Sequence, residues 1–293
     1  MDIGRVGIWT FALDQQPASV GREAVAELEE LGYGAVWVPE AVGREAMANA
    51  GLLLSATRQM VVATGIANMW MRHPMAAGAG WRTLNEAYDG RFLMGIGVSH
   101  GPSVGRMLGQ TWDRPLQRMR DYLDGMDEAI FFAAPPAVPP SRVLAALGPK
   151  MLDLARERSL GAHPYFVPVE HTVFARERLG PGPLLAPEQA VVLETDPDIA
   201  RSTARTHMAG YIGLPNYANN LLRMGFTEAD LADGGSDRLV DAIVAWGDVD
   251  AIADRVAAHH DAGADHVCIQ VIEADHSVLP MEAWRRLAPA LVP

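Results

Sequence analysis

The feature of this sequence that most constrains its fold is a unit that recurs along the chain: a helical stretch, a glycine, then a short apolar run. In the first unit, Ser19 is a candidate helix N-cap, apolar residues follow at helical spacing as far as Leu31, and Gly32 precedes the run 35–38. A glycine after the last turn can take the left-handed conformation that ends a helix. The order recurs in residues 74–98, 149–166 and 249–272. Helices that alternate with strands predict a parallel β-sheet built from βαβ units.

Four further apolar runs bring the expected strands to eight; they are residues 6–11, 61–66, 142–147 and 189–193. Continuous apolar runs are typical of parallel strands whose outer face is covered by helices. Eight repeats in 293 residues predict an α/β fold, a (β/α)8 TIM barrel that forms one domain over residues 1–293. The alternative is an open, doubly wound sheet.

Two stretches interrupt the repeat of helices and strands. Residues 133–141 contain four prolines and predict a short extended insertion before the fifth strand. Residues 209–248 are longer and mixed in composition, and they predict an excursion of helices and loops after the seventh strand. We expect this excursion to belong to the barrel and not to form a second domain.

Composition excludes several classes of partner. The chain has 24 basic and 36 acidic residues, a net charge of −12, which argues against binding to nucleic acid or to anionic membranes. Its one cysteine, Cys268, excludes an internal disulfide and is expected to be a buried, unreactive thiol. We find no metal-ligand spacing, no secretory signal pattern and no apolar stretch of about 18 residues, so we expect a cytoplasmic protein without a metal.

Barrel enzymes carry their chemistry on the loops that follow the strands, so we examined these positions first. Glu40 follows the second strand and could act as an acid or base, or simply cap a loop. Ser99 and His100 follow the fourth strand, where an imidazole can move protons near neutral pH; the alternative is a structural histidine. Residues 95–101 begin like a dinucleotide-binding GxGxxG motif, but His100 occupies its sixth position, so we reject that interpretation.

Two other strand ends carry candidate cofactor contacts. Gly65 follows the third strand and permits close approach of a ligand, unless this segment is ordinary rim packing. After the fifth strand, Gly148 and Pro149 open a helix whose N-terminal N–H groups could bind a phosphate. Lys150, the only lysine beside 23 arginines, would add a positive charge there; a plain helix start is the alternative.

We expect aromatic and histidine side chains near the strand ends to shape a substrate pocket, with help from the segment 211–220. These candidates are Trp9, Phe11, Trp70, His163, Tyr165 and Tyr217.

The chain resembles the bacterial luciferase-like superfamily, and within it the oxidoreductases that use the deazaflavin coenzyme F420. The resemblance covers almost the whole chain and rests on residues 31–40, 63–66, 90–97 and 144–149. It implies a (β/α)8 barrel, usually a homodimer, with the cofactor at the C-terminal face of the barrel. It also implies a non-prolyl cis peptide at Gly65-Ile66 against the cofactor ring. The cofactor-binding residues that we expect are Glu40, Gly65, Ile66, Asn68, Ser99, His100, Leu147, Gly148, Pro149 and Lys150.

Two departures from the family pattern narrow the expected reaction. Sugar-phosphate dehydrogenases of this superfamily have an Asp-His pair after the second strand and a glutamate after the fourth, where this chain has Glu40, Ala41 and His100. The resemblance therefore favours hydride transfer from the reduced deazaflavin to an unsaturated or carbonyl acceptor. The insertion at 133–141 is shorter than in the family's monooxygenases, which shield a reactive flavin.

We therefore expect an F420-dependent oxidoreductase that acts on a small molecule, with His100 as proton donor or electrostatic partner and Glu40 as a contact to the ring or a hydroxyl group. Two alternatives stay open: a monooxygenase that uses FMN on the same fold, and a cofactor-binding protein without turnover.

Overall fold

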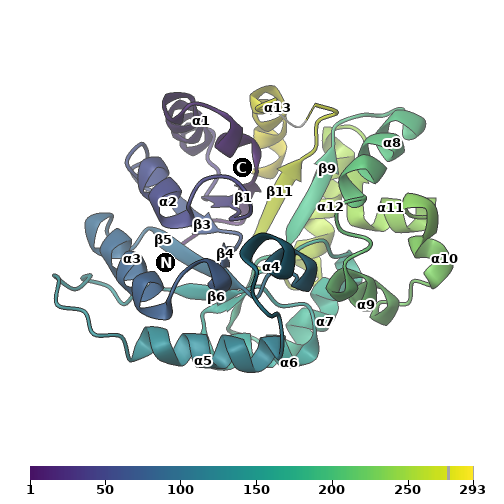
Figure 1. The fold of residues 1–293 in the computed structure, drawn as a ribbon. Helices are drawn as coiled ribbons and strands as arrows, with labels where there is room; N and C mark the ends of the chain where they lie inside the picture. The colour runs from purple at the N-terminus through teal and green to yellow at the C-terminus, as the bar shows by residue number, and fades with distance from the viewer. Residues whose placement is uncertain (276–277, 293) are drawn as a thin grey trace.

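The computed structural model describes residues 1–275 and 278–292 and shows a parallel sheet curled into a barrel with helices around it (Figure 1). All eight expected strands occur in these residues, most of them shorter than expected. They are β1 (Val6–Trp9), β2 (Ala35–Val38), β3 (Val61–Thr64), β5 (Phe92–Gly97), β6 (Arg142–Leu144), β7 (Gly161–Ala162), β9 (Glu188–Val192) and β11 (Val267–Val271). A short strand, β4 (Ala67–Asn68), lies beside β5.

One segment, residues 184–192, closes the barrel. Its first part, β8 (Leu184–Leu185), pairs with β7, and its second part, β9, pairs with β11. On the other side, β11 pairs in parallel with β1, which brings Val6 opposite Val267. The first and last strands are therefore neighbours, and the alternative of an open, doubly wound sheet is wrong.

The helices that follow the strands cover the outside of the barrel. They are α1 (Ala18–Glu30), α2 (Ala46–Leu54), α3 (Pro74–Ala87), α5 (Pro115–Asp127), α6 (Pro149–Arg158), α7 (Val169–Leu179), α12 (Val249–Asp261) and α13 (Met281–Leu291). Gly32 ends the first helical unit with a φ of 92°, in the left-handed region. Ser19 is not the N-cap of α1, because the helix begins one residue earlier, after Pro17.

The strands bury side chains on both faces, which explains their continuous apolar sequence. Trp37, Leu93 and Cys268 belong to the cluster that fills the barrel, whereas their neighbours such as Val36 pack outward against the helices. Cys268 is fully buried, and burial holds the pKa of its thiol well above the usual range, so the expectation of a buried thiol is confirmed.

The two predicted interruptions are present. Residues 133–141 have no regular secondary structure. The excursion consists of helices, as expected, and of one strand that we did not expect, β10, which pairs with β9. Its elements, together with the helix that precedes it, are α8 (Pro197–Met208), α9 (Pro215–Arg223), α10 (Glu228–Leu231), η3 (Ala232–Gly234), α11 (Asp237–Ile243) and β10 (Val244–Trp246).

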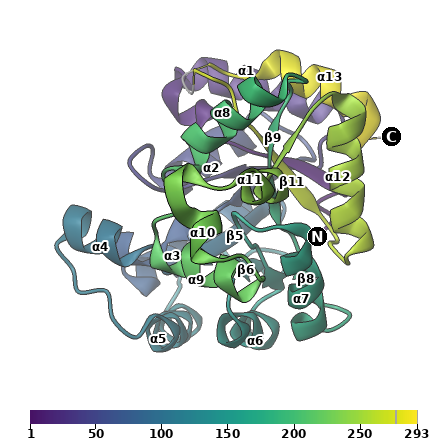
Figure 2. The same cartoon turned by 90° about the vertical axis from the view of Figure 1, so that its right-hand side faces the viewer.

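The short helix α4 (Gly101–Leu108) marks the end of the barrel where the strands finish, and the N-terminus lies toward the other end (Figure 2). Two 3-10 helices, η1 (Ala12–Gln15) and η2 (Met69–Met71), follow β1 and β4 at the same end as α4. Across residues 1–275 and 278–292, we find no helix with the length and apolar character that crossing a membrane requires.

Candidate active site

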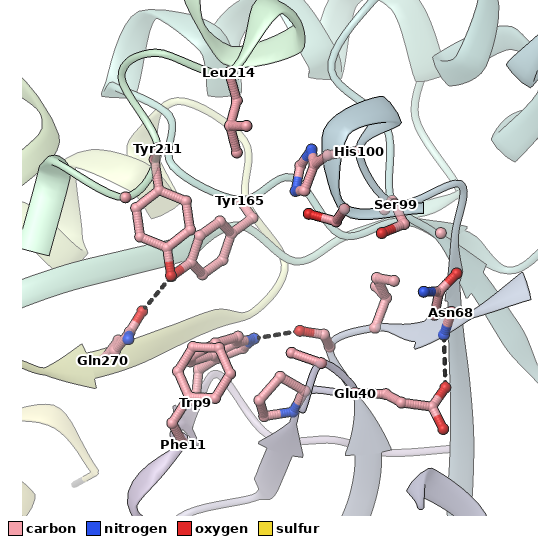
Figure 3. A pocket seen from close by; sticks show the side chains of 18 of the residues that line it. Trp9, Phe11, Glu40, Asn68, Ser99, His100, Tyr165, Tyr211, Leu214 and Gln270 are labelled. Atoms are coloured by element: carbon pink, nitrogen blue, oxygen red, sulfur yellow. Dashed lines mark hydrogen bonds between the residues drawn. The ribbon is translucent and has the colours of Figure 1, made fainter. Parts of the chain in front are cut away.

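A cavity of about 1030 Å³ opens at the end of the barrel where the strands finish. The loops after the strands and the beginning of the excursion enclose it (Figure 3). The structure brings most of the predicted site residues together in its lining; they are Trp9, Phe11, Glu40, Gly65, Ile66, Asn68, Ser99, His100, Leu147, Gly148, His163, Tyr165 and Tyr217.

The peptide Gly65-Ile66 lies in the cavity wall and is cis, as the resemblance implied. The indole N–H of Trp9 donates a hydrogen bond to the Gly65 carbonyl at 2.9 Å. A Cβ on Gly65 would lie 2.5 Å from Trp9 Nε1 and 3.0 Å from His163 Nε2. Gly65 is therefore required by the close packing of the barrel beneath this peptide.

His163 presents an unpaired nitrogen beneath the cavity. Its Nδ1 donates to the Ala186 carbonyl at 2.7 Å, and its ring stacks on Trp37 at 4.4 Å between centroids. Burial lowers its pKa to about 4, so the ring is neutral at pH 7 and Nε2 carries a lone pair. This buried Nε2 has no hydrogen-bond partner among the described residues. A donor on a ligand would satisfy it.

The carboxylate of Glu40 is fully engaged by the protein. Both of its oxygens accept hydrogen bonds from the guanidinium of Arg72, one of them, from Nη1 to Oε2, at 2.8 Å. The backbone N–H of Ala46 donates to Oε1 at 3.1 Å, and the backbone N–H of Asn68 donates to Oε2 at 2.8 Å. Glu40 thus holds together the loops after β2 and β3, and no lone pair stands out as free for acid–base work.

His100 is oriented by a residue of the excursion. Its Nδ1 lies 3.0 Å from Oδ1 of Asn216, and because an amide oxygen only accepts, Nδ1 carries the proton. Burial is the larger influence on its pKa and lowers it, against the raising effect of Asn216, so the imidazole is neutral at pH 7. Nε2 therefore carries a lone pair at the cavity. The preceding residue, Ser99, has a φ of 54°, a rare conformation that often marks functional sites.

Two hydroxyl groups and an amide form a hydrogen-bonded chain in the lining of the cavity (Figure 3). The Tyr165 hydroxyl donates to Oε1 of Gln270 at 2.9 Å, and its oxygen accepts from the Tyr211 hydroxyl at 3.0 Å. Burial raises the pKa of Tyr211 to about 12 and that of Tyr165 well above its usual value, so both stay protonated. The chain fixes the amide of Gln270, and its NH2 group has no partner among the described side chains and backbone groups.

The turn before α6 lies at the edge of the cavity. His171 donates from Nε2 to the Leu147 carbonyl at 2.9 Å, which fixes the turn. A Cβ on Gly148 would meet only Nη2 of Arg223, at 3.9 Å, so the turn faces open space beside a guanidinium. Arg223 comes from α9 of the excursion.

Three predicted site residues, Trp70, Pro149 and Lys150, do not line the cavity, and their contacts with substrate or cofactor stay predictions. The indole N–H of Trp70 donates to the Val98 carbonyl at 2.9 Å, and its ring packs beside Arg118 on the outside of the loop. Pro149 is the first residue of α6. Lys150 is exposed on the same helix and has no partner among the described residues.

Sequence reasoning missed several residues of the site. Gln270 had a usable signal, since it is a polar residue near the end of an apolar strand. Arg72 and Arg223 had no such signal, because no pattern in the neighbouring sequence connects them with Glu40 or Gly148. Asn216 falls within the segment expected to shape the pocket, but its pairing with His100 was not foreseen. Within the described ranges, no group of three or more His, Cys, Asp or Glu side chains could hold a metal ion.

Known proteins resemble this chain over most of its length. The sequence model of the luciferase-like monooxygenases matches residues 6–266. A protein of Mycobacterium tuberculosis named as a coenzyme F420-dependent oxidoreductase is 25% identical, over 92% of this chain and 95% of its own length.

Two solved structures share the fold. The coenzyme F420-dependent tetrahydromethanopterin reductase from Methanopyrus kandleri superposes with a TM-score of 0.77 at 16% identity, over 99% of each chain. The oxygenating constituent of 3,6-diketocamphane monooxygenase from Pseudomonas putida, in complex with FMN, gives a TM-score of 0.70 at 15% identity, over 98% of each chain. At such identities these likenesses support the fold alone.

Proposed function

Because the chain belongs to the luciferase-like monooxygenase family, we propose that it is an oxidoreductase that uses coenzyme F420 to exchange a hydride with a small organic substrate in this cavity. The observation that carries the proposal is Nε2 of His100, a neutral ring nitrogen without a protein partner that lines a cavity large enough for a flat cofactor and a substrate together. The relative from M. tuberculosis supports the choice of F420.

The residues present fit such a cofactor. The orphaned Nε2 of His163 can accept a hydrogen bond from a ring N–H, and the peptide Gly65-Ile66 offers a surface for a planar ring. The open turn at Gly148 offers the N-terminal N–H groups of α6 to an anionic tail, with Arg223 beside it. When bound, the deazaflavin supplies or takes up a hydride.

His100 would manage the proton that accompanies the hydride. In the oxidising direction, the free Nε2 takes the proton of a substrate hydroxyl group as its C–H bond gives up the hydride. In the reducing direction, the protonated imidazole returns that proton to the carbonyl oxygen. Because burial lowers the pKa of His100, the neutral imidazole is the main form at pH 7. We expect reduction to slow, and oxidation to accelerate, as the pH rises through this pKa.

Glu40 would act as a positioning residue. Its carboxylate already accepts four hydrogen bonds from the protein, and it fixes the backbone of Asn68 at the cavity wall. Lys150 remains a proposed contact of the cofactor's anionic tail, now together with Arg223.

A second candidate is an FMN-dependent monooxygenase, which the shared fold of the FMN-bound neighbour favours. Titration of the purified protein with F420 and with FMN separates the two. We expect tight binding of F420, and hydride exchange with at least one substrate in a broad set. Tight FMN binding without F420 binding would contradict the proposal, and binding without any turnover would identify a cofactor-binding protein.

The change His100→Ala tests the proton-transfer role. General acid–base catalysis contributes about 10²–10⁴-fold to a rate, so we expect kcat to fall by about a hundredfold or more while the affinity for F420 is unchanged. Unimpaired turnover with intact binding would remove His100 from the mechanism.

A further inference from the structure

Six rings form a continuous surface along one side of the cavity, and we call them the aromatic wall. Successive ring centroids lie 4.8 Å apart for Phe11 and Trp9, 4.9 Å for Trp9 and Tyr165, 5.3 Å for Tyr165 and Tyr211, 5.7 Å for Tyr211 and Tyr217, and 5.2 Å for Tyr217 and His100. All six rings line the cavity. Successive rings are tilted or edge-on, with interplanar angles of 41° to 83°, so they pack against one another and present a stable, largely apolar surface to a ligand.

The lining beside the aromatic wall offers no cation to an anionic substrate; Arg223, beside the turn at Gly148, is the cation proposed for the cofactor's anionic tail. Among the described residues, no lysine or arginine lines the cavity, and the charged side chains in its lining are Asp14, Glu40 and Glu273. Arg72 already neutralises Glu40 from behind the wall of the cavity. The carboxyl group of Asp14 accepts a hydrogen bond at 2.9 Å from the amide of Asn49. A negative charge buried in such a place lacks a partner and is unfavourable.

The side-chain amide of Gln270 is a neutral hydrogen-bond donor beside the aromatic wall. Oε1 of Gln270 accepts from the Tyr165 hydroxyl, which turns the amide so that the NH2 group is left for a ligand. This amide is beside Tyr165, in the middle of the aromatic wall, and the imidazole of His100 forms one end of the wall. A ligand oxygen that accepts a hydrogen bond would satisfy the amide, since an unpaired buried donor is unfavourable.

The aromatic wall is apolar, no lysine or arginine of the described residues lines the cavity, and the amide of Gln270 is left for a ligand. From these three observations we propose that the substrate is an uncharged, largely apolar organic molecule that carries a carbonyl or hydroxyl oxygen. The inference rests on the proposed function in taking the aromatic wall as the side where the substrate binds. It excludes phosphorylated and carboxylated substrates.

Calorimetric titration with probes that share one naphthalene scaffold tests the charge preference without turnover. The probes are 2-acetonaphthone, 2-naphthoate and 2-naphthylmethylammonium, which are neutral, anionic and cationic. We expect the ketone to bind at least about tenfold more tightly than the naphthoate, because no lysine or arginine of the described lining would pair with the carboxylate. Equal or tighter binding of either ion would overturn the proposal.

The change Gln270→Leu tests the donor. We expect it to weaken the binding of 2-acetonaphthone by about two- to tenfold, the effect of one hydrogen bond. The affinity for 2-ethylnaphthalene, which has no oxygen, should be unchanged. An equal effect on both probes would show that Gln270 only shapes the wall.

A gain-of-function variant locates the binding site. Leu214 lines the cavity at the start of α9, so Leu214→Arg would place a cation beside the wall, and we expect it to tighten 2-naphthoate by at least about tenfold. Leu222→Arg makes the same change on α9 at a position that does not line the cavity, and it should leave all three affinities unchanged. Equal effects of the two variants would place the probes elsewhere.

Failure of this inference and failure of the proposed function are distinguishable. If F420 binds and turns over while the charge order is reversed, the substrate class is wrong and the function stands. If the charge order is as expected but F420 does not bind, the cavity is described correctly and the cofactor is wrong.

Discussion

The imidazole of His100 owes its reactive form to a partner 116 positions away, the side-chain amide of Asn216. The change Asn216→Asp would place a carboxylate against Nδ1, which stabilises the imidazolium, so we expect the pKa of His100 to rise by about one unit or more. The pH dependence of turnover should move upward by the same amount. NMR titration of the His100 ring in the protein without substrate measures the pKa directly.

Asn219→Asp is the matched control, since it adds the same charge to α9 at an exposed position. We expect it to shift the pKa of His100 by only a few tenths of a unit, because solvent screens exposed charges. Equal shifts in the two variants would mean that Asn216 acts through a general field and not through its hydrogen bond.

Glu40 and Arg72 form a largely buried ion pair, and its loss should appear first in stability. Arg72→Ala leaves the carboxylate without its counter-charge, so we expect the free energy of unfolding to fall by about 3 kcal/mol. The double variant Glu40→Gln with Arg72→Met should recover part of this loss, as measured by urea unfolding. A Glu40→Gln protein as stable as the wild type, with intact cofactor binding and no turnover, would show that Glu40 takes part in the chemistry.

These residues show what a sequence can reveal about a site. The positions of Glu40 and His100 at strand ends were predictable, because parallel strands finish at one edge and bring their loops together. The partners that decide the chemistry of these two side chains were not predictable. Arg72 contacts Glu40, and Asn216 contacts His100, only because different loops pack together. The role expected of Glu40 depended on its being free, and the sequence contains no sign of the arginine that occupies it.

At the scale of elements, the start of α6 is where a cofactor's anionic tail would bind. The guanidinium of Arg223 lies beside the open turn at Gly148, whereas Lys150 is exposed one residue into the helix. We therefore expect Arg223→Ala to weaken F420 by about tenfold at low salt, and Lys150→Ala to weaken it less.

Titration of F420 at two ionic strengths measures both effects, and Arg238→Ala, on α11 of the same excursion, is the control. A loss in Lys150→Ala as large as in Arg223→Ala would restore the lysine as the main contact. Unchanged affinity in both variants would move the anionic tail away from this turn.

The strands of the barrel were predictable because each is a continuous apolar run, and four of the helices because each has a clear boundary, such as Pro74 at the start of α3. The short strands β4, β8 and β10 were missed. Strands of two or three residues carry too little pattern to recognise, and they exist only because a neighbouring strand offers its backbone.

For the whole molecule, buried histidines should govern stability on the acid side. Burial lowers the pKa of His163, His171 and His266 to about 4 and that of His259 to about 3, below the usual 6.5. The unfolded chain therefore binds protons first, and stability falls as the pH decreases from about 6.5 to about 4. Glu188 affects stability in the opposite direction, since burial raises its pKa from 4.5 to about 8. Its contribution to the free energy of unfolding is lost as the pH rises from 4.5 to about 8.

Urea unfolding of the wild type and of Glu188→Gln at pH 5, 6.5 and 8.5 separates the two effects. Both proteins should lose stability between pH 6.5 and 5. The wild type should lose stability relative to the variant as the pH rises to 8.5. Parallel curves over the alkaline range would mean that Glu188 is ionised in the folded protein at pH 7.

The single domain over residues 1–293 and the homodimer stay predictions at this scale.

Some of the residues proposed to meet the substrate are contiguous in the gene. Tyr211, Leu214 and Tyr217 lie within one short stretch of the excursion, whereas the peptide Gly65-Ile66 and the turn at Gly148 belong to the barrel loops. A single recombination event that exchanges this stretch and keeps Asn216 could therefore reshape one side of the substrate pocket while these barrel loops stay as inherited. A directed-evolution library confined to these three codons, which leaves the hydrogen bond between Asn216 and His100 in place, would explore new specificities with little risk to the proposed chemistry.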